Sequence, residues 1–203
     1  MNKFMDNDSE YTMQNHNRPF DRAQGRRSIR LKNYDYSSPG AYFVTICIND
    51  RQCLLGKIVN RKTKLNKTGE IIYDEWLKTS IIRMNVKLDE FIIMPNHLHG
   101  IIIITNGNGL VVGANRRFVP TRIAQNNKMK PNTLCSIIAQ FKSVATKRIR
   151  QNGFPNFQWQ RNYYEHIIRN ESELNRIRKY IQNNPQQWEI DQENSKLKEI
   201  KHA

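Results

Sequence analysis

The sequence predicts an α+β fold, a sandwich in which about four or five mainly antiparallel strands form a central sheet with helices packed on it. Some segments are dense in β-branched and aromatic residues, as strands are, and others space their apolar residues near the helical period of 3.6. The expected order of strand, helix, strand, strand, helix, strand, helix lacks the regular alternation of a doubly wound sheet.

Short segments are expected to form the strands and helices in this order. Strands are expected at residues 41–49, 87–94, 97–105 and 163–169, with a short hairpin at 53–66. Amphipathic helices are expected at residues 69–84, 133–150 and 170–184.

Local signals set several boundaries of these elements. Pro95 excludes a continuous helix through the two central apolar runs, so we expect an antiparallel strand pair there. Thr133 is suited to cap the second helix. Asn170, with Glu173 three residues later, resembles a capping box, and Pro185 is expected to close the last helix.

The ordered elements are expected to form one domain over residues 29–190. Residues 1–28 are rich in Asn, Asp, Arg and Gln without periodicity, and we expect a mobile basic and polar arm there. Residues 106–132 combine glycine, proline and basic side chains and are expected to be a long exposed loop. Residues 191–203 are expected to be a charged tail.

The charge pattern indicates a nucleic-acid partner. The chain carries 33 Lys and Arg against 18 Asp and Glu, a net charge of +15. No acidic residue lies between Glu90 and Glu165. We expect basic side chains of this stretch to contact DNA phosphates, with a merely solvated loop as the alternative for its first part. The cations expected to bind DNA are Arg116, Arg117, Arg122, Lys142, Lys147, Arg148, Arg150 and Arg161.

Membrane association is not expected. No apolar run approaches the roughly 20 residues that a bilayer-spanning helix needs, and no secretory signal is visible at the N-terminus. We therefore expect a cytoplasmic, nucleoid-associated protein with no membrane partner, acting as a monomer or a homodimer.

The sequence His97-Leu98-His99 is the first candidate for chemistry. Alternate strand residues point to one face, so both imidazoles are expected side by side while Leu98 turns into the core. Two imidazoles so arranged can hold one divalent cation, and a third, oxygen ligand is expected for Mg²⁺ or Mn²⁺. The alternative is a pair of histidines on a strand face without a metal.

The last expected helix supplies the second candidate. Tyr180 and Asn184 are spaced i and i+4, so a phenol and an amide face the same place. A tyrosine oxygen can attack phosphorus, and an amide oxygen can complete a cation's shell. The alternative is a core-edge tyrosine and a helix-ending asparagine. Tyr163 and Tyr164, which neighbour His166, are accessory candidates and the next choice of nucleophile.

Three segments together resemble a known family. The segments Phe-Ile-Ile-Met-Pro-Asn-His-Leu-His-Gly-Ile, around the two histidines, and Arg178-Lys-Tyr-Ile-Gln-Asn-Asn-Pro185 resemble the paired motifs of the HUH single-tyrosine transposases. Trp159-Gln-Arg-Asn-Tyr-Tyr-Glu-His-Ile-Ile-Arg169 resembles a segment characteristic of the REP-associated tyrosine transposase branch. The resemblance covers roughly Arg27 to Trp188.

This resemblance implies a small ferredoxin-like fold that cuts and rejoins single-stranded DNA. His97, His99 and Asn184 would hold Mg²⁺ or Mn²⁺ against the scissile phosphate. Tyr180 would attack phosphorus and form a 5′-phosphotyrosine link, leaving a free 3′-hydroxyl. The function expected is a metal-dependent DNA transposase, a single-strand endonuclease and ligase that acts on hairpin or palindromic-repeat DNA.

Two other functions stay open at this point. One is a non-catalytic or domesticated protein that binds palindromic repeats. The other is a metal-dependent hydrolytic nuclease in which Tyr180 is structural. A covalent protein–DNA adduct distinguishes them, because only the transposase forms one.

Overall fold

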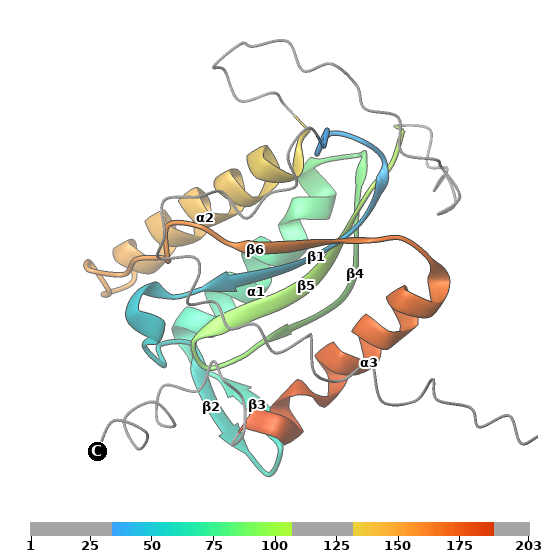
Figure 1. Cartoon of the computed structure of the whole chain (residues 1–203). Coiled ribbons are helices and arrows are strands. Elements are labelled where there is room, and N and C mark those ends of the chain that lie inside the picture. The colour runs from blue at the N-terminus through green and yellow to red at the C-terminus, as the bar shows by residue number, and fades with distance from the viewer. Residues whose placement is uncertain (1–33, 107–131, 189–203) are drawn as a thin grey trace, which may run out of the picture.

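The computed structural model describes residues 34–106 and 132–188, which form a four-stranded sheet with helices on both faces (Figure 1). The strands of the sheet are β1 (Gly40–Cys47), β4 (Val86–Ile93), β5 (His97–Ile104) and β6 (Tyr164–Ile168). The helices are α1 (Lys67–Ile82), α2 (Leu134–Gln151) and α3 (Glu171–Gln187). A 3-10 turn, η2 (Asn49–Arg51), and a separate hairpin of β2 (Gly56–Val59) and β3 (Lys62–Leu65) follow β1.

Several predicted features lie outside the described residues. They are the arm 1–28, the tail 191–203 and all of the loop 106–132 except its first and last residues. Arg116, Arg117 and Arg122 lie outside with that loop. No helix in the described part is long and apolar enough to cross a bilayer.

The sheet has the topology of a ferredoxin-like fold. The strand order is β4-β5-β1-β6, and each neighbouring pair is antiparallel. In chain order, β1, α1, β4, β5, α2 and β6 make the βαββαβ arrangement, with the β2–β3 hairpin inserted before α1 and α3 appended at the end. The predicted α+β sandwich, with about four or five mainly antiparallel strands, is confirmed, and the sheet has four.

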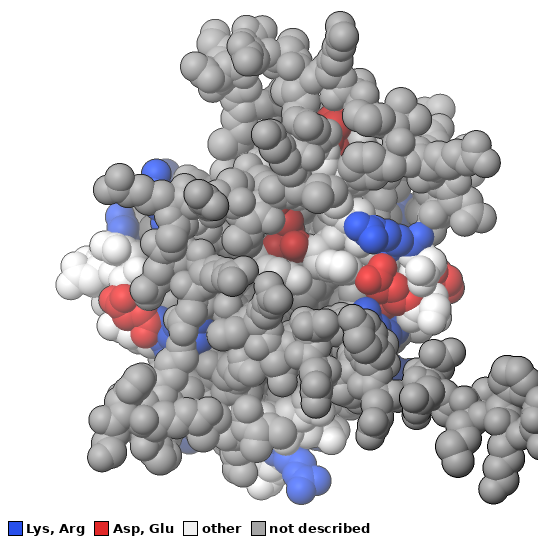
Figure 2. All heavy atoms as spheres, viewed as in Figure 1, with Lys and Arg blue, Asp and Glu red and all other residues white. Residues whose placement is uncertain are grey.

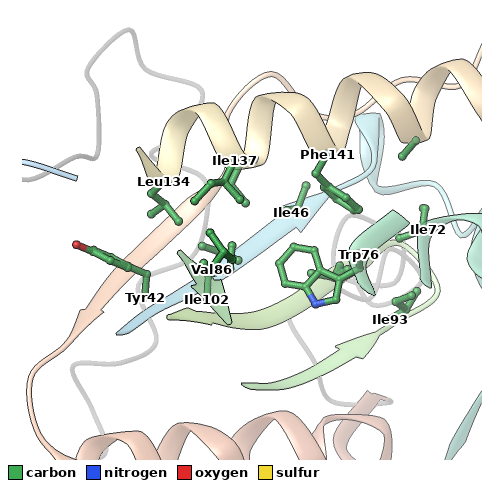
Figure 3. Packing of buried hydrophobic residues seen from close by; sticks show 14 of the residues in the cluster. Tyr42, Ile46, Ile72, Trp76, Val86, Ile93, Ile102, Leu134, Ile137 and Phe141 are labelled. Carbon is green, nitrogen blue, oxygen red and sulfur yellow. The ribbon is translucent and has the colours of Figure 1, made fainter. Parts of the chain in front are cut away.

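Most of the apolar core lies between the sheet and the pair α1 and α2. Figure 3 shows Trp76 of α1 and Phe141 of α2 packed in the same layer as Ile46 and Ile102 of the two central strands. The ring centroids of Trp76 and Phe141 are 5.2 Å apart in an edge-to-face arrangement, and Trp76 is fully buried. This layer fixes the central strands from one side.

A smaller apolar layer holds α3 against the opposite face. Ile177 and Ile181 of α3 pack with Phe43 of β1 and Ile101 of β5. The chain therefore buries alternate residues of each central strand in different layers, which is the period-two pattern of a sheet covered on both sides.

Side-chain capping hydrogen bonds mark the first turns of α1 and α2. The side chain of Asn66 accepts a hydrogen bond from the Gly69 amide (3.0 Å), so α1 begins two residues before the predicted position. Thr133 caps α2 as predicted, accepting from the Ser136 amide (3.1 Å).

The predicted capping box of α3 is half present. Asn170 accepts from the Glu173 amide (2.8 Å). The Glu173 carboxylate, however, accepts from the Arg169 amide (2.8 Å) and contacts His166 Nε2 (2.7 Å) instead of returning to Asn170. Glu173 thereby ties the start of α3 to the end of β6.

The prediction that Pro185 closes the last helix is wrong, because α3 continues to Gln187. A proline in a helix removes one backbone donor and crowds the carbonyl four residues earlier. Here it stands in the last turn, where one lost hydrogen bond matters least, and its ring is buried. Burial of the ring compensates for that loss.

Polar contacts set the position of α3 along the sheet. Arg178 makes a two-pronged ion pair with Asp89 of β4, with Nε–Oδ1 at 2.8 Å and Nη2–Oδ2 at 2.6 Å. One turn later, Gln182 Nε2 donates to Glu90 Oε2 (3.0 Å). The Arg178 hydrogen bonds lower the pKa of Asp89. Figure 2 shows acidic and basic side chains next to one another where α3 begins.

Gly100→Ala is expected to destabilise the fold, because an added Cβ would lie 2.5 Å from Cζ2 of the buried Trp76. Overpacking of this kind costs about 1–3 kcal/mol, measured as the free energy of unfolding in urea. Gly40→Ala is the matched control, because its Cβ would meet nothing closer than 3.7 Å. Equal stability of both variants would show that Trp76 moves freely.

Asp89→Asn is expected to lower the free energy of unfolding at neutral pH by about 1 kcal/mol, since it removes the charge from a partly exposed ion pair. The folded-state pKa of Asp89 is lowered, so this stabilisation is present above the ordinary aspartate pKa of about 3.9 and is lost as pH falls through the lowered value. Urea unfolding of both proteins across this range measures it. A difference between them that stays constant into acid would contradict the ion-pair origin.

Candidate active site

Two buried imidazoles lie side by side on the α3 face of the sheet. His97 and His99 alternate with Leu98 along β5, and Leu98 points into the main core as predicted. The exposed fractions of His97 and His99 are 0% and 2%, and their Nε2 atoms are 2.9 Å apart. The strand therefore directs both ring nitrogens to one point.

The other ring nitrogen of His97 is held by its neighbour in sequence. Asn96 Oδ1 lies 2.7 Å from His97 Nδ1, while Asn96 Nδ2 donates to the carbonyl of Arg51 (3.0 Å). That second bond fixes which way the amide points, so Nδ1–H of His97 must donate a hydrogen bond to Oδ1. His97 Nε2 is thus left with a lone pair.

His99 is held from the neighbouring strand. Thr45 of β1 is paired with His99 in the sheet, and its hydroxyl lies 2.8 Å from His99 Nδ1. Thr45 is itself buried. Each imidazole therefore has one nitrogen oriented by a polar neighbour and the other facing its partner, as in histidines that bind metals.

The surroundings favour the neutral form of both rings. Burial is the main cause that lowers the pKa of His97 and of His99, and the neighbouring His99 and Arg51 lower that of His97 further. Neutral imidazole is the form that binds a metal ion.

One stripe of α3 faces the histidine pair. Tyr180 Oη lies 3.4 Å from His99 Nε2, and the Trp188 ring centroid is 6.1 Å from that of His97. Asn184 is four residues from each, so it lies between them on the same side of the helix. The sequence prediction that Tyr180 and Asn184 share a face is confirmed, and that face meets the histidines.

Asn184 and Tyr180 differ in exposure. Asn184 is 2% exposed, and its Oδ1 is buried without a hydrogen-bond partner in the described part of the chain. A buried acceptor left in this way costs roughly 1–3 kcal/mol. Tyr180 is 43% exposed, so its phenol lies beside the pair and still reaches solvent.

The residues present fit a divalent cation held by two nitrogens and one oxygen. Two ligand atoms at right angles, each about 2.1 Å from a cation, lie about 3 Å apart, which matches the 2.9 Å between the two Nε2 atoms. The unpartnered oxygen of Asn184 is a suitable third donor. No group of three or more His, Cys, Asp or Glu side chains suited to a metal occurs within residues 34–106 and 132–188.

The accessory candidates occupy different places. Tyr164 of β6 is paired with Thr45, so it lies on the histidine face, two strands from His99. Burial raises its pKa. Tyr163 packs against the main core on the opposite face, and His166 contacts Glu173. Of the two alternative tyrosines, only Tyr164 shares the face of the histidine pair.

Five of the cations predicted to bind DNA lie within the described residues, and their surroundings differ. Arg148 is paired with Glu75 and with Asp74 (3.6 Å) of α1, which neutralises it. The remaining four line one groove, and they are Lys142, Lys147, Arg150 and Arg161.

Sequence reasoning missed the two residues that orient the imidazoles. Asn96 directly precedes His97, and this adjacency was the available signal. Thr45 gave no such signal, because it meets His99 only through the register between β1 and β5.

Comparisons with known proteins identify a relative by sequence and a neighbour by structure. No protein-family model matches the chain. An uncharacterized protein of Haemophilus influenzae is 44% identical over 167 residues, which is 82% of this chain and 92% of that protein. A solved REP-associated tyrosine transposase bound to a REP hairpin has a TM-score of 0.52 and 19% identity, covering 79% of this chain and 73% of its own. The chain thus belongs to the family of the Haemophilus influenzae protein, and it has the fold of a REP-associated tyrosine transposase.

Proposed function

We propose that this protein is a transposase that cuts and rejoins single-stranded DNA of hairpin-forming repeats. The observation that carries the proposal is the phenol of Tyr180 beside the buried His97 and His99 pair, 3.4 Å from His99 Nε2. The structural neighbour, a REP-associated tyrosine transposase bound to a REP hairpin, supports the same reaction class and the same kind of DNA.

In the proposed reaction, Tyr180 is the nucleophile. A bond forms between its Oη and the phosphorus, and the phenol proton is released. The bond from phosphorus to the 3′ oxygen breaks, and that oxygen takes up a proton to leave as a hydroxyl. The product is a 5′-phosphotyrosine link, which conserves the energy of the phosphodiester, so rejoining is the reverse step and needs no ATP.

His97, His99 and Asn184 would hold Mg²⁺ or Mn²⁺ in this proposal. The bound cation would supply charge neutralisation at the phosphate oxygens. Asn96 would hold His97 in the tautomer that presents Nε2, and the Thr45 hydroxyl, which can donate or accept, would orient the His99 ring. Helix α3 would fix Tyr180 relative to the ligands, because phosphoryl transfer depends mainly on positioning.

Tyr180→Phe is expected to abolish the covalent adduct and the cutting of a single-stranded hairpin oligonucleotide, because only the attacking oxygen is removed. DNA affinity should change little. Denaturing gels of protein mixed with labelled DNA detect the adduct. Tyr164→Phe is the control on the same face of the sheet and should still form the covalent adduct. If Tyr180→Phe forms the adduct and Tyr164→Phe does not, the nucleophile is Tyr164 of β6. Cutting without any adduct would instead favour a hydrolytic nuclease, and DNA binding without cutting a binding protein.

Replacing both His97 and His99 by Ala is expected to remove Mn²⁺ binding, measured by calorimetry, together with cutting. Asn96→Ala should weaken Mn²⁺ binding about 10–100-fold, because it frees the His97 ring. His166→Ala is the control, since this histidine contacts Glu173 instead of the pair. Unchanged Mn²⁺ affinity in the double variant, or full cutting in EDTA, would contradict the metal site.

A further inference from the structure

A basic groove of about 690 Å³ lies between the C-terminal half of α2 and residues 158–161. Its lining contains four cations and no Asp or Glu. The cations are Lys142, Lys147, Arg150 and Arg161, and most of the other lining side chains are amides and hydroxyls. All of these can donate hydrogen bonds to an anion.

Two of the four cations join the walls of the groove. Lys142 Nζ donates to the carbonyl of Gln160 (2.6 Å), and burial lowers the pKa of Lys142 to about 8. Arg150 donates to the carbonyl of Phe157 through Nε (3.2 Å) and Nη2 (3.1 Å). In the other direction, Trp159 Nε1 donates to the Lys142 carbonyl (3.3 Å). The groove is therefore built before any ligand arrives.

The other two cations are available to a ligand. Lys147 and Arg161 are exposed, and neither pairs with a carboxylate within the described residues. Arg148, their neighbour on α2, instead turns to α1 and is neutralised by Glu75 and Asp74. Positive charge on this side of α2 is thus concentrated in the groove.

One wall of the groove is connected to the strand next to the histidine pair, while the other wall, α2, lies on the opposite face of the sheet from the histidines. The first wall is joined to the end of β1, because the Gln160 amide donates to the Cys47 carbonyl (2.9 Å). Cys47 is in turn the sheet partner of His97. Two strand spacings of about 4.8 Å separate this wall from β5 in the plane of the sheet. DNA that contacts both the groove and the histidine pair must also pass from one face of the sheet to the other.

We propose that this groove, on the α2 side of the sheet, binds the phosphate backbone of DNA away from the phosphate that Tyr180 attacks, with Lys147 and Arg161 as the contacting cations. This inference rests on the proposed function and adds a second contact site to it. The groove favours a phosphate backbone over an acidic protein surface because its lining residues are cations, amides and hydroxyls, with Trp159 as the single apolar residue among them.

The test compares two double variants of the full chain that lose the same charge. Lys147→Gln with Arg161→Gln removes the available cations of the groove. Lys67→Gln with Lys87→Gln is the control, because both residues are exposed and lie outside the groove. Affinity for a fluorescent hairpin oligonucleotide with a single-stranded flank is measured by anisotropy between about 50 and 200 mM salt.

The groove variant is expected to bind about tenfold more weakly at 100 mM salt, and the slope of log affinity against log salt should flatten by about 1.4, which is 0.7 for each lost phosphate contact. The control should keep the wild-type affinity and slope. Wild-type behaviour of the groove variant would overturn the proposal and leave an acidic protein as the partner. Equal losses in both variants would overturn it too. Failure of the proposed function is recognised separately, as the absence of a covalent adduct in wild-type protein.

Discussion

The alternation of side chains along β5 is the constraint on which the site depends. Leu98 and Ile102 enter the main core while His97, His99 and Ile101 face α3. A register slip of one residue would put both imidazoles under α1 and α2 and turn Leu98 toward α3. The slip is opposed on both edges, because β1 and β4 each pair with β5. It is also opposed by the close approach of Trp76 to Gly100. The pattern that builds the core thus also places the histidines.

Helix α3 converts this strand geometry into a composite site. Its apolar residues Ile177 and Ile181 meet Ile101, the next residue on the histidine face of β5. Its polar anchors lie at separate levels, Glu173 at the first turn and Arg178 further along, so the helix is restrained against both sliding and rotation. Tyr180 is exposed but belongs to a fixed element, and a reacting group on a rigid helix is positioned more precisely than one on a loop.

The sequence was sufficient for the order of elements, the ferredoxin-like resemblance and the shared face of Tyr180 and Asn184, because all of these follow from periodicity and motifs within single segments. It was insufficient where the outcome depends on a distant partner. Thr45 orients His99 only because two strands meet in one register. Arg148 satisfies the same helical period as its basic neighbours, yet a carboxylate on α1 neutralises it. Pro185 continues α3 because tertiary burial outweighs a local breaking rule.

The polar atoms of the site explain why a cation would suit it. His97 Nε2 presents a lone pair to His99 Nε2 at 2.9 Å, so without a cation a proton on His99 must fill the gap. Asn184 Oδ1, buried on the facing helix, has no donor among the described residues. One divalent ion coordinated by all three atoms would take the place of that proton and would also satisfy the amide oxygen. Burying these groups without full hydrogen bonding costs folding free energy. Under the proposed function, cation binding would offset that cost, because a ligand that binds only the folded state stabilises the folded state.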